Sequence, residues 1–198
     1  MKNQKTHIFL VYSVYSAAFF ALGVLIFYLL PENSLIYRGI DDGIYRNITS
    51  NLHLSFSATA STFADEVKYP LFIFVAVFTA RRNLLFISLL SYKGFMTGAG
   101  LTCVMRAVKQ GIYDTVSPSL LCFVYSAVSV SLLGLLCYFC VESIWFSKKL
   151  IYPPKLRTVA KRRDTVRYIF IFFAVCGALL LITIIKHGNL LLMISPKG

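Results

Sequence analysis

Charged side chains inside apolar segments are the residues of this chain best placed to do chemistry. Lys93 lies in the middle of the apolar segment 83–105, and Glu142 lies in the segment 119–146. Asp65 and Glu66 come just before a third apolar stretch. A charge at such a depth is costly in lipid, so it usually faces a protein interior or a water-filled cavity. There it can move protons, bind ions or pair with a second charge.

Lys93 allows two interpretations. In the first, it binds an anion, a lipid headgroup or an acidic partner, or it lines the path of a transporter or channel. In the second, which we favour, it snorkels or forms an ion pair with a carboxylate such as Glu142 or Asp65. Transporters with broken helices usually show two corresponding breaks in repeated halves. The sequence shows neither a second break nor an obvious internal repeat.

An intramembrane enzyme would need titratable groups that converge, and Lys93, Glu142, Asp65 and Glu66 are the candidates. The sequence contains no H-E-x-x-H, G-x-S-x-G or P-loop motif. A C-x-x-C pair at residues 137 and 140 lies inside an apolar segment, without a second pair or a nearby histidine, so we interpret it as packing. We therefore predict no enzymatic activity, no cofactor and no metal site.

The glycines that follow Lys93 predict an interrupted helix and close packing. Gly94 and Gly98 form a G-x-x-x-G motif, and Gly100 extends the small face. Glycine weakens a helix but allows two backbones to approach closely. We predict a break in the span near Lys93, and we favour packing within the molecule over dimerisation.

The composition predicts an all-α, polytopic membrane protein with a single domain at 1–198. Hydrophobic residues make up 58% of the chain and gather in several runs of about twenty residues. We predict five spans, at about 7–30, 58–80, 83–105, 119–146 and 168–186. The second span carries charges in its outer half, where Lys68 can snorkel and Asp65, three residues earlier, is its candidate partner.

The net charge of +12 reflects membrane topology rather than nucleic-acid binding, because most basic residues flank the spans. We predict an outer loop at 31–57 and a basic cytoplasmic loop at 147–167, which faces the anionic inner leaflet. The N-terminus is then cytoplasmic and the C-terminus outside, with twelve basic residues inside against six outside. The basic loop contains Lys148, Lys149, Lys155, Arg157, Lys161, Arg162, Arg163 and Arg167.

The third span is expected to cross the membrane fully, despite its break. A re-entrant hairpin at 83–105 would place the basic loop outside, on the side that positive charge disfavours. A full crossing places that loop in the cytoplasm.

Residues 84–111 read LLFISLLSYKGFMTGAGLTCVMRAVKQG, an apolar run that leads into Lys93-Gly94 and then Gly98. The run, Lys93-Gly94 and Gly98 occupy positions that match a family pattern, and the segment 68–111 resembles the stage II sporulation protein M family. The remainder fits in outline, with one N-terminal span, a polar outer segment, a long fourth span, a basic inner loop and a last span. The chain departs from the family in the charged break at 79–83, and it keeps only the proline of a Pro-Gln-Asn motif, at Pro118.

This resemblance implies a scaffold without chemistry of its own. Members of the family look like anchors in the bacterial cell membrane for a peptidoglycan-degrading complex during endospore engulfment. Their hydrolytic partners are stage II sporulation proteins D and P. The alternative from the residues alone is a small transporter or channel component with Lys93 lining the path.

Overall fold

Five helices and one short strand pair make up the part of the chain that the structure describes. The computed structural model describes residues 2–31, 34, 56–109, 114–115, 118–150 and 159–195. The helices are α1 (Lys2–Leu29), α3 (Phe56–Ala76), α4 (Arg82–Lys109), α5 (Pro118–Leu150) and α6 (Val159–Met193). Two-residue strands β1 (Asp114–Thr115) and β2 (Ile194–Ser195) pair antiparallel.

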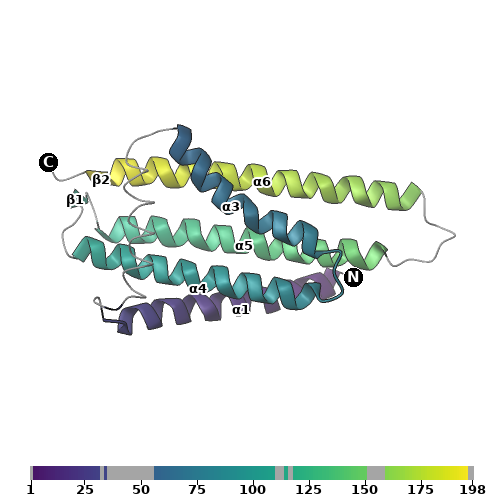
Figure 1. The fold of residues 1–198 in the computed structure, drawn as a ribbon, viewed down its shortest axis with the longest axis horizontal. Helices are drawn as coiled ribbons and strands as arrows, with labels where there is room; N and C mark the ends of the chain where they lie inside the picture. The colour runs from purple at the N-terminus through teal and green to yellow at the C-terminus, as the bar shows by residue number, and fades with distance from the viewer. Residues whose placement is uncertain are drawn as a thin grey trace.

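The helices lie side by side, and each runs in the direction opposite to the one before it (Figure 1). Helix α3 crosses its neighbours obliquely, whereas the other four follow the long axis. The start of α1 and the end of α6 therefore lie at opposite ends of the bundle. The basic end holds the starts of α1, α4 and α6 and the ends of α3 and α5. Its described basic residues are Lys2, Lys5, Arg81, Arg82, Lys148, Lys149, Lys161, Arg162, Arg163 and Arg167.

Four helices are long and apolar enough to cross a bilayer. Their apolar stretches are Gln4–Leu29, Arg82–Arg106, Cys122–Lys148 and Arg162–Ile185. Large apolar side chains such as Phe123 and Phe170 point outward and are at least 70% exposed. A contiguous apolar surface of this extent suits lipid rather than water. The prediction of a membrane-embedded helical bundle is thereby confirmed.

Helix α3 differs from the other four because Asp65, Glu66 and Lys68 lie within it. Its 21 residues extend over about 31 Å, close to the thickness of a bilayer core. The three charges keep it outside the set of strongly apolar helices. Its crossing of the membrane, and with it the fifth span, stays a prediction.

The predicted break near Lys93 is wrong. Helix α4 runs without interruption for 28 residues, or about 42 Å, with Lys93 in its middle. The chain is instead interrupted just before α4, at residues 77–81, where Phe78 and Thr79 donate backbone hydrogen bonds in tight turns. A continuous helix of this length crosses the whole bundle, which agrees with a full crossing and rules out a hairpin. The glycines are tolerated because α1 packs directly against them.

Helices α1 and α4 approach each other at backbone distance. A Cβ added at Gly98 would collide with the carbonyl oxygen of Phe20 and lie 3.0 Å from the amide nitrogen of Val24. One added at Gly94 would lie 2.5 Å from the carbonyl oxygen of Ser16. From the other side, Gly23 faces the backbone of α4 in the same way. In this structure the G-x-x-x-G motif therefore packs against a helix of the same chain.

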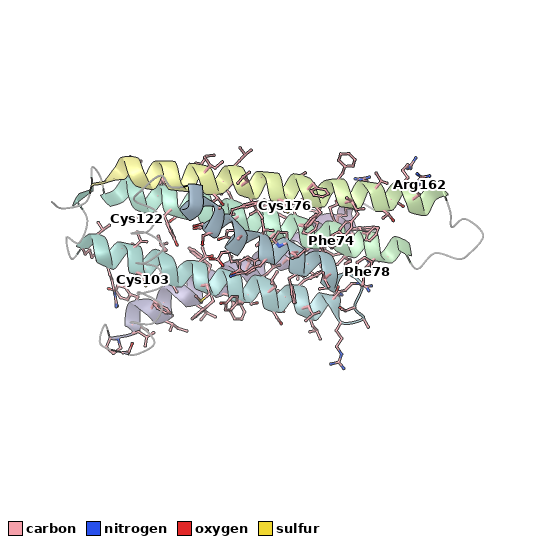
Figure 2. All side chains as sticks on the ribbon, turned by 45° about the horizontal axis from the view of Figure 1, so that its top comes forward. Phe74, Phe78, Cys103, Cys122, Arg162 and Cys176 are labelled. Carbon is pink, nitrogen blue, oxygen red and sulfur yellow. The ribbon has the colours of Figure 1, made fainter. Side chains whose placement is uncertain are left out.

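Aromatic rings fill the space between α3, α5 and α6 near the basic end. The ring of Tyr168 stacks on Phe146 at a centroid distance of 4.2 Å, and its hydroxyl lies 2.8 Å from the Ser143 hydroxyl. Phe74 of α3 stacks on Tyr168 from another side, at 5.4 Å. Phe74 and Phe78 lie where α3 crosses the bundle, and Arg162 marks the nearby start of α6 (Figure 2). This cluster holds α3 and fixes the walls of the pocket described below.

Arg106 connects the far end of α4 to the end of α1. Its guanidinium donates hydrogen bonds to the carbonyl oxygens of Tyr28, at 2.7 Å, and Leu30, at 3.2 Å. Tyr28 belongs to the last turn of α1 and Leu30 directly follows that helix, at an end where helix carbonyls lack partners within the helix. We expect Arg106→Gln to lower the free energy of unfolding by about 1 kcal/mol. Thermal unfolding in detergent measures this, and Lys109→Gln, less than a turn further along, is the control that leaves stability unchanged.

Candidate functional site

The first candidate site is a buried ion pair between α3 and α4. The ammonium of Lys93 lies 2.8 Å from each carboxylate oxygen of Glu66. Their side chains are only 12% and 13% exposed. The same ammonium lies 4.3 Å from the ring centre of Tyr69, one turn along α3, which adds a cation–π contact. Each charge in this site therefore has an opposite charge beside it.

Lys93 and Gly94 attach α4 to two different helices. Lys93 reaches α3 through the ion pair, whereas Gly94, the next residue, lies against the α1 backbone. Consecutive residues on a helix point about 100° apart, so one dipeptide can serve two neighbours. Gly98 repeats the contact with α1 one turn later, and Gly100 is also buried. The contacts of this site are electrostatic and steric, and they hold α4 against α3 and α1.

The charges predicted as intramembrane partners are arranged in separate pairs. Lys68 binds Asp65 at 3.0 Å, as the spacing predicts. Lys93, however, pairs with Glu66 and not with Asp65 or Glu142. The candidate groups for an intramembrane enzyme are thus divided among three ion pairs, because Glu142 pairs with Lys5.

The pair of Lys68 and Asp65 is exposed, at 58% and 61%, so its contribution to stability is small. We expect Lys68→Ala to change the free energy of unfolding by less than about 0.5 kcal/mol. Thermal unfolding in detergent is the measurement. A loss as large as that of a buried pair would show that α3 is held through Lys68 instead of Lys93.

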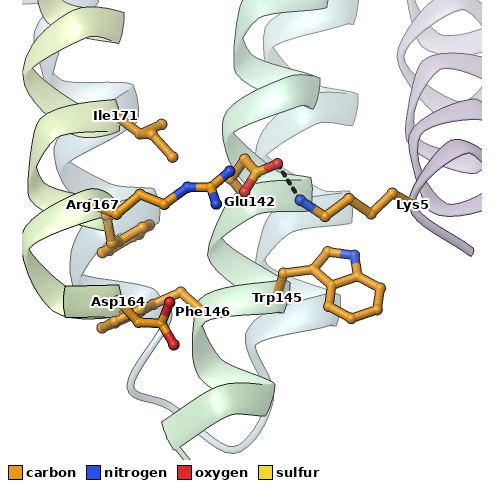
Figure 3. Close-up of a pocket in the computed structure, with 8 residues that line it drawn as sticks. Lys5, Glu142, Trp145, Phe146, Asp164, Arg167 and Ile171 are labelled. Atoms are coloured by element: carbon orange, nitrogen blue, oxygen red, sulfur yellow. Dashed lines mark hydrogen bonds and ion pairs between the residues drawn. The ribbon is translucent and has the colours of Figure 1, made fainter. Parts of the chain in front are cut away.

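The second candidate site is a pocket at the basic end (Figure 3). It has a volume of about 160 Å³ and lies between α1, α5 and α6. Its lining consists of Lys5, Glu142, Trp145, Phe146, Asp164, Arg167, Tyr168 and Ile171. Lys5 and Glu142 form an ion pair of 2.5 Å across it, and the guanidinium of Arg167 points toward Glu142 from the opposite side.

Trp145 is held at this pocket between two ammonium groups. Lys5 lies 5.6 Å and Lys148 lies 5.2 Å from the ring centre. The indole N–H of Trp145 is buried and has no hydrogen-bond acceptor among the described residues. A tryptophan with cations around it at the end of an apolar helix is typical of the membrane–water boundary.

The sequence does not predict this pocket. Glu142 is predicted there as a candidate partner of Lys93, whereas in the structure it binds Lys5, 137 residues away in the sequence. One signal in the sequence could have indicated the pair. Glu142 is an acid in a long apolar segment, and Lys5 is a base near the start of another, so each could neutralise the other. Only the packing of α1 against α5 shows that the two meet.

The predicted basic loop at 147–167 is largely helical, which corrects its boundaries. Helix α5 continues to Leu150 and α6 begins at Val159, so Lys148 and Lys149 belong to α5, and Lys161, Arg162, Arg163 and Arg167 belong to α6. Lys155 and Arg157 lie outside the described residues. The side chains of Lys148, Arg162, Arg163 and Arg167 are exposed. Of the predicted outer loop at 31–57, residues 32–33 and 35–55 also lie outside the described residues.

The cysteines take part in packing. Cys137 and Cys140 are buried in the main apolar cluster, and both are free thiols. Within the described ranges, no three His, Cys, Asp or Glu side chains lie close enough together to hold a metal ion. Comparison with protein-family models, with curated proteins and with solved structures gave no match to this chain.

Proposed function

We propose that this chain is a non-enzymatic scaffold of the stage II sporulation protein M type, embedded in a bacterial cell membrane. Its role is to hold peptidoglycan-degrading partners during engulfment. The observation that supports this best is the double attachment of α4 through Lys93 and Gly94. These are the residues that carry the family resemblance, and here they join three helices.

A transport path through Lys93 has less support. Its ammonium is held by both oxygens of Glu66 and by the ring of Tyr69, and little of the side chain is exposed. Lys93 does not line the pocket at the basic end. A path through this point would require the buried pair to separate, at a cost of several kcal/mol.

The proposed orientation places the basic end in the cytoplasm. Positive charge near short connections marks the cytoplasmic side, and the basic end carries most of the described charge. The segment 31–57, which connects the far end of α1 to α3, then faces the outside. That segment is where we propose that the hydrolytic partners dock.

Affinity purification from the native membrane, followed by mass spectrometry, tests the scaffold. We expect cell-wall hydrolases to accompany the tagged wild-type chain and a Lys68→Ala variant, which keeps the fold. A variant in which residues 35–53 are replaced by a glycine–serine segment of equal length should lose them. Enrichment of an ATPase or a permease, with no hydrolase, would instead support the transport hypothesis.

A further inference from the structure

We propose that the pocket at the basic end binds the headgroup of a phospholipid that carries both a phosphate and a primary amine, as phosphatidylethanolamine does. The pocket lies at the level of Trp145, where lipid headgroups meet water. Binding of a lipid headgroup to this pocket requires only that the helices lie in a bilayer. The assignment therefore holds for a scaffold and for a transporter alike.

The pocket has a size and a lining that suit a headgroup. Its volume of about 160 Å³ corresponds to roughly five water molecules. Charged side chains from α1, α5 and α6 form one part of the lining, whereas Phe146, Tyr168 and Ile171 form an apolar part. A small polar group joined to an apolar chain matches such a divided surface.

The balance of charge in the pocket favours a zwitterion. Lys5 and Arg167 bring two positive charges, and Glu142 and Asp164 bring two negative ones. Lys5 and Glu142 already neutralise each other. A purely anionic headgroup would meet the carboxylates, and a purely cationic one would meet the guanidinium. A ligand with both charges can place each one near its opposite.

The functional groups of phosphoethanolamine match the side chains individually. The exposed guanidinium of Arg167 offers paired N–H donors, the geometry that binds phosphate oxygens best. The primary ammonium of the ligand donates hydrogen bonds to carboxylates, which Asp164, less than one turn before Arg167, provides. Choline lacks those N–H donors. The indole N–H of Trp145 has no acceptor within the described part of the chain, and a phosphate oxygen is an acceptor of the kind it lacks.

The outer surface beside the pocket can receive the acyl chains. Phe170, adjacent to the pocket residue Ile171, is 72% exposed. Tyr138, one turn before Glu142 on α5, is 45% exposed. Both rings lie on the outer surface of helices that line the pocket. A headgroup in the pocket would therefore keep its chains in the bilayer.

Binding of defined lipids to the full chain in detergent tests the proposal. Trp145 is the only tryptophan in the sequence, so its fluorescence reports on the pocket directly. Phosphatidylethanolamine, phosphatidylcholine and phosphatidylglycerol with identical acyl chains are titrated in turn, and native mass spectrometry counts the lipids that remain bound. We expect phosphatidylethanolamine to bind about tenfold more tightly than the other two, the effect of one charge-assisted hydrogen bond.

Three variants separate the pocket from the surrounding positive charge. Arg167→Gln should weaken binding of phosphatidylethanolamine about tenfold, whereas Arg163→Gln, an exposed arginine on the same helix outside the pocket lining, should leave it unchanged. Asp164→Asn should remove the preference for phosphatidylethanolamine over phosphatidylcholine. Circular dichroism verifies that each variant is folded.

Three results would overturn the assignment. Equal binding of the three lipids, or equal effects of Arg167→Gln and Arg163→Gln, would show that only general attraction to the membrane surface acts here. Binding of soluble glycerophosphoethanolamine as tight as that of the lipid would show that the pocket recognises a free metabolite and not a membrane lipid.

Discussion

Gly98→Leu is expected to separate α1 from α4 and to remove most of the folded protein from the membrane. A Cβ at this position would already collide with the carbonyl oxygen of Phe20, which belongs to a helix backbone and cannot turn aside. Overpacking a well-packed interior costs about 1–3 kcal/mol for smaller intrusions than this. We therefore expect Gly98→Ala to lower the free energy of unfolding by about 2 kcal/mol, and the leucine to lower it further. Unfolding of the purified protein by a denaturing detergent measures both.

Glycines elsewhere in the bundle provide the matched control. A Cβ at Gly177 of α6 has no atom within 4 Å, so Gly177→Ala and Gly177→Leu change the same residue type in a transmembrane helix without a collision. Both should leave stability unchanged or raise it slightly, because alanine and leucine favour the helix more than glycine does. Equal losses at the two positions would attribute the effect at Gly98 to the loss of glycine itself, and the close contact of α1 with α4 would then have no energetic importance.

Lys93→Met is expected to destabilise the protein by about 3–5 kcal/mol, because it leaves the carboxylate of Glu66 buried without its partner. The double variant Lys93→Met, Glu66→Leu removes both charges and should recover most of that loss. Thermal unfolding of the two single variants and the double variant forms a mutant cycle that isolates the interaction. If the double variant is as unstable as the sum of the single ones, the two residues act independently.

The comparison with Lys68 shows why burial decides the size of the effect. Lys68 and Asp65 have nearly the same separation as Lys93 and Glu66, yet both remain more than half exposed. Solvent and headgroups can replace a lost partner at an exposed site, but not at a buried one. Loss of Lys93 should therefore destabilise the protein far more than loss of Lys68, although the acid of each pair lies in α3.

Much of the fold is predictable from hydropathy, because long apolar segments in this chain become long helices. The predicted spans 7–30, 119–146 and 168–186 all fall almost entirely within observed helices. The break predicted near Lys93 is wrong because the residues of α4 alone do not show which neighbours that helix packs against. The charge and the glycines both disfavour an isolated apolar helix, but Glu66 neutralises the first and α1 explains the second. Both partners are distant in the sequence.

The candidate sites show the same limit at the level of single residues. The sequence places Asp65 and Glu66 equally near Lys93, and only the facing of α3 decides that Glu66 turns inward while Asp65 turns outward. Adjacent helical residues point about 100° apart. The residues around positions 65 and 66 mix polar and apolar types, so the sequence does not show which of the two faces inward. Lys5 and Glu142 were recognisable one by one, and their meeting depends on the packing of α1 with α5.

The close contact of α1 with α4 sets an order of events in biosynthesis. Helix α1 leaves the ribosome first, but α4 is complete only at Lys109, about 80 residues later. At about 5–20 residues per second, α1 waits for roughly 4–16 seconds with the face around Gly23 open to lipid or to other helices. Its Lys5 waits longer still, until Glu142 arrives. Helix α1 is thus synthesised first but is among the last to gain its packing partners. During that interval the insertion machinery must prevent it from packing against other helices.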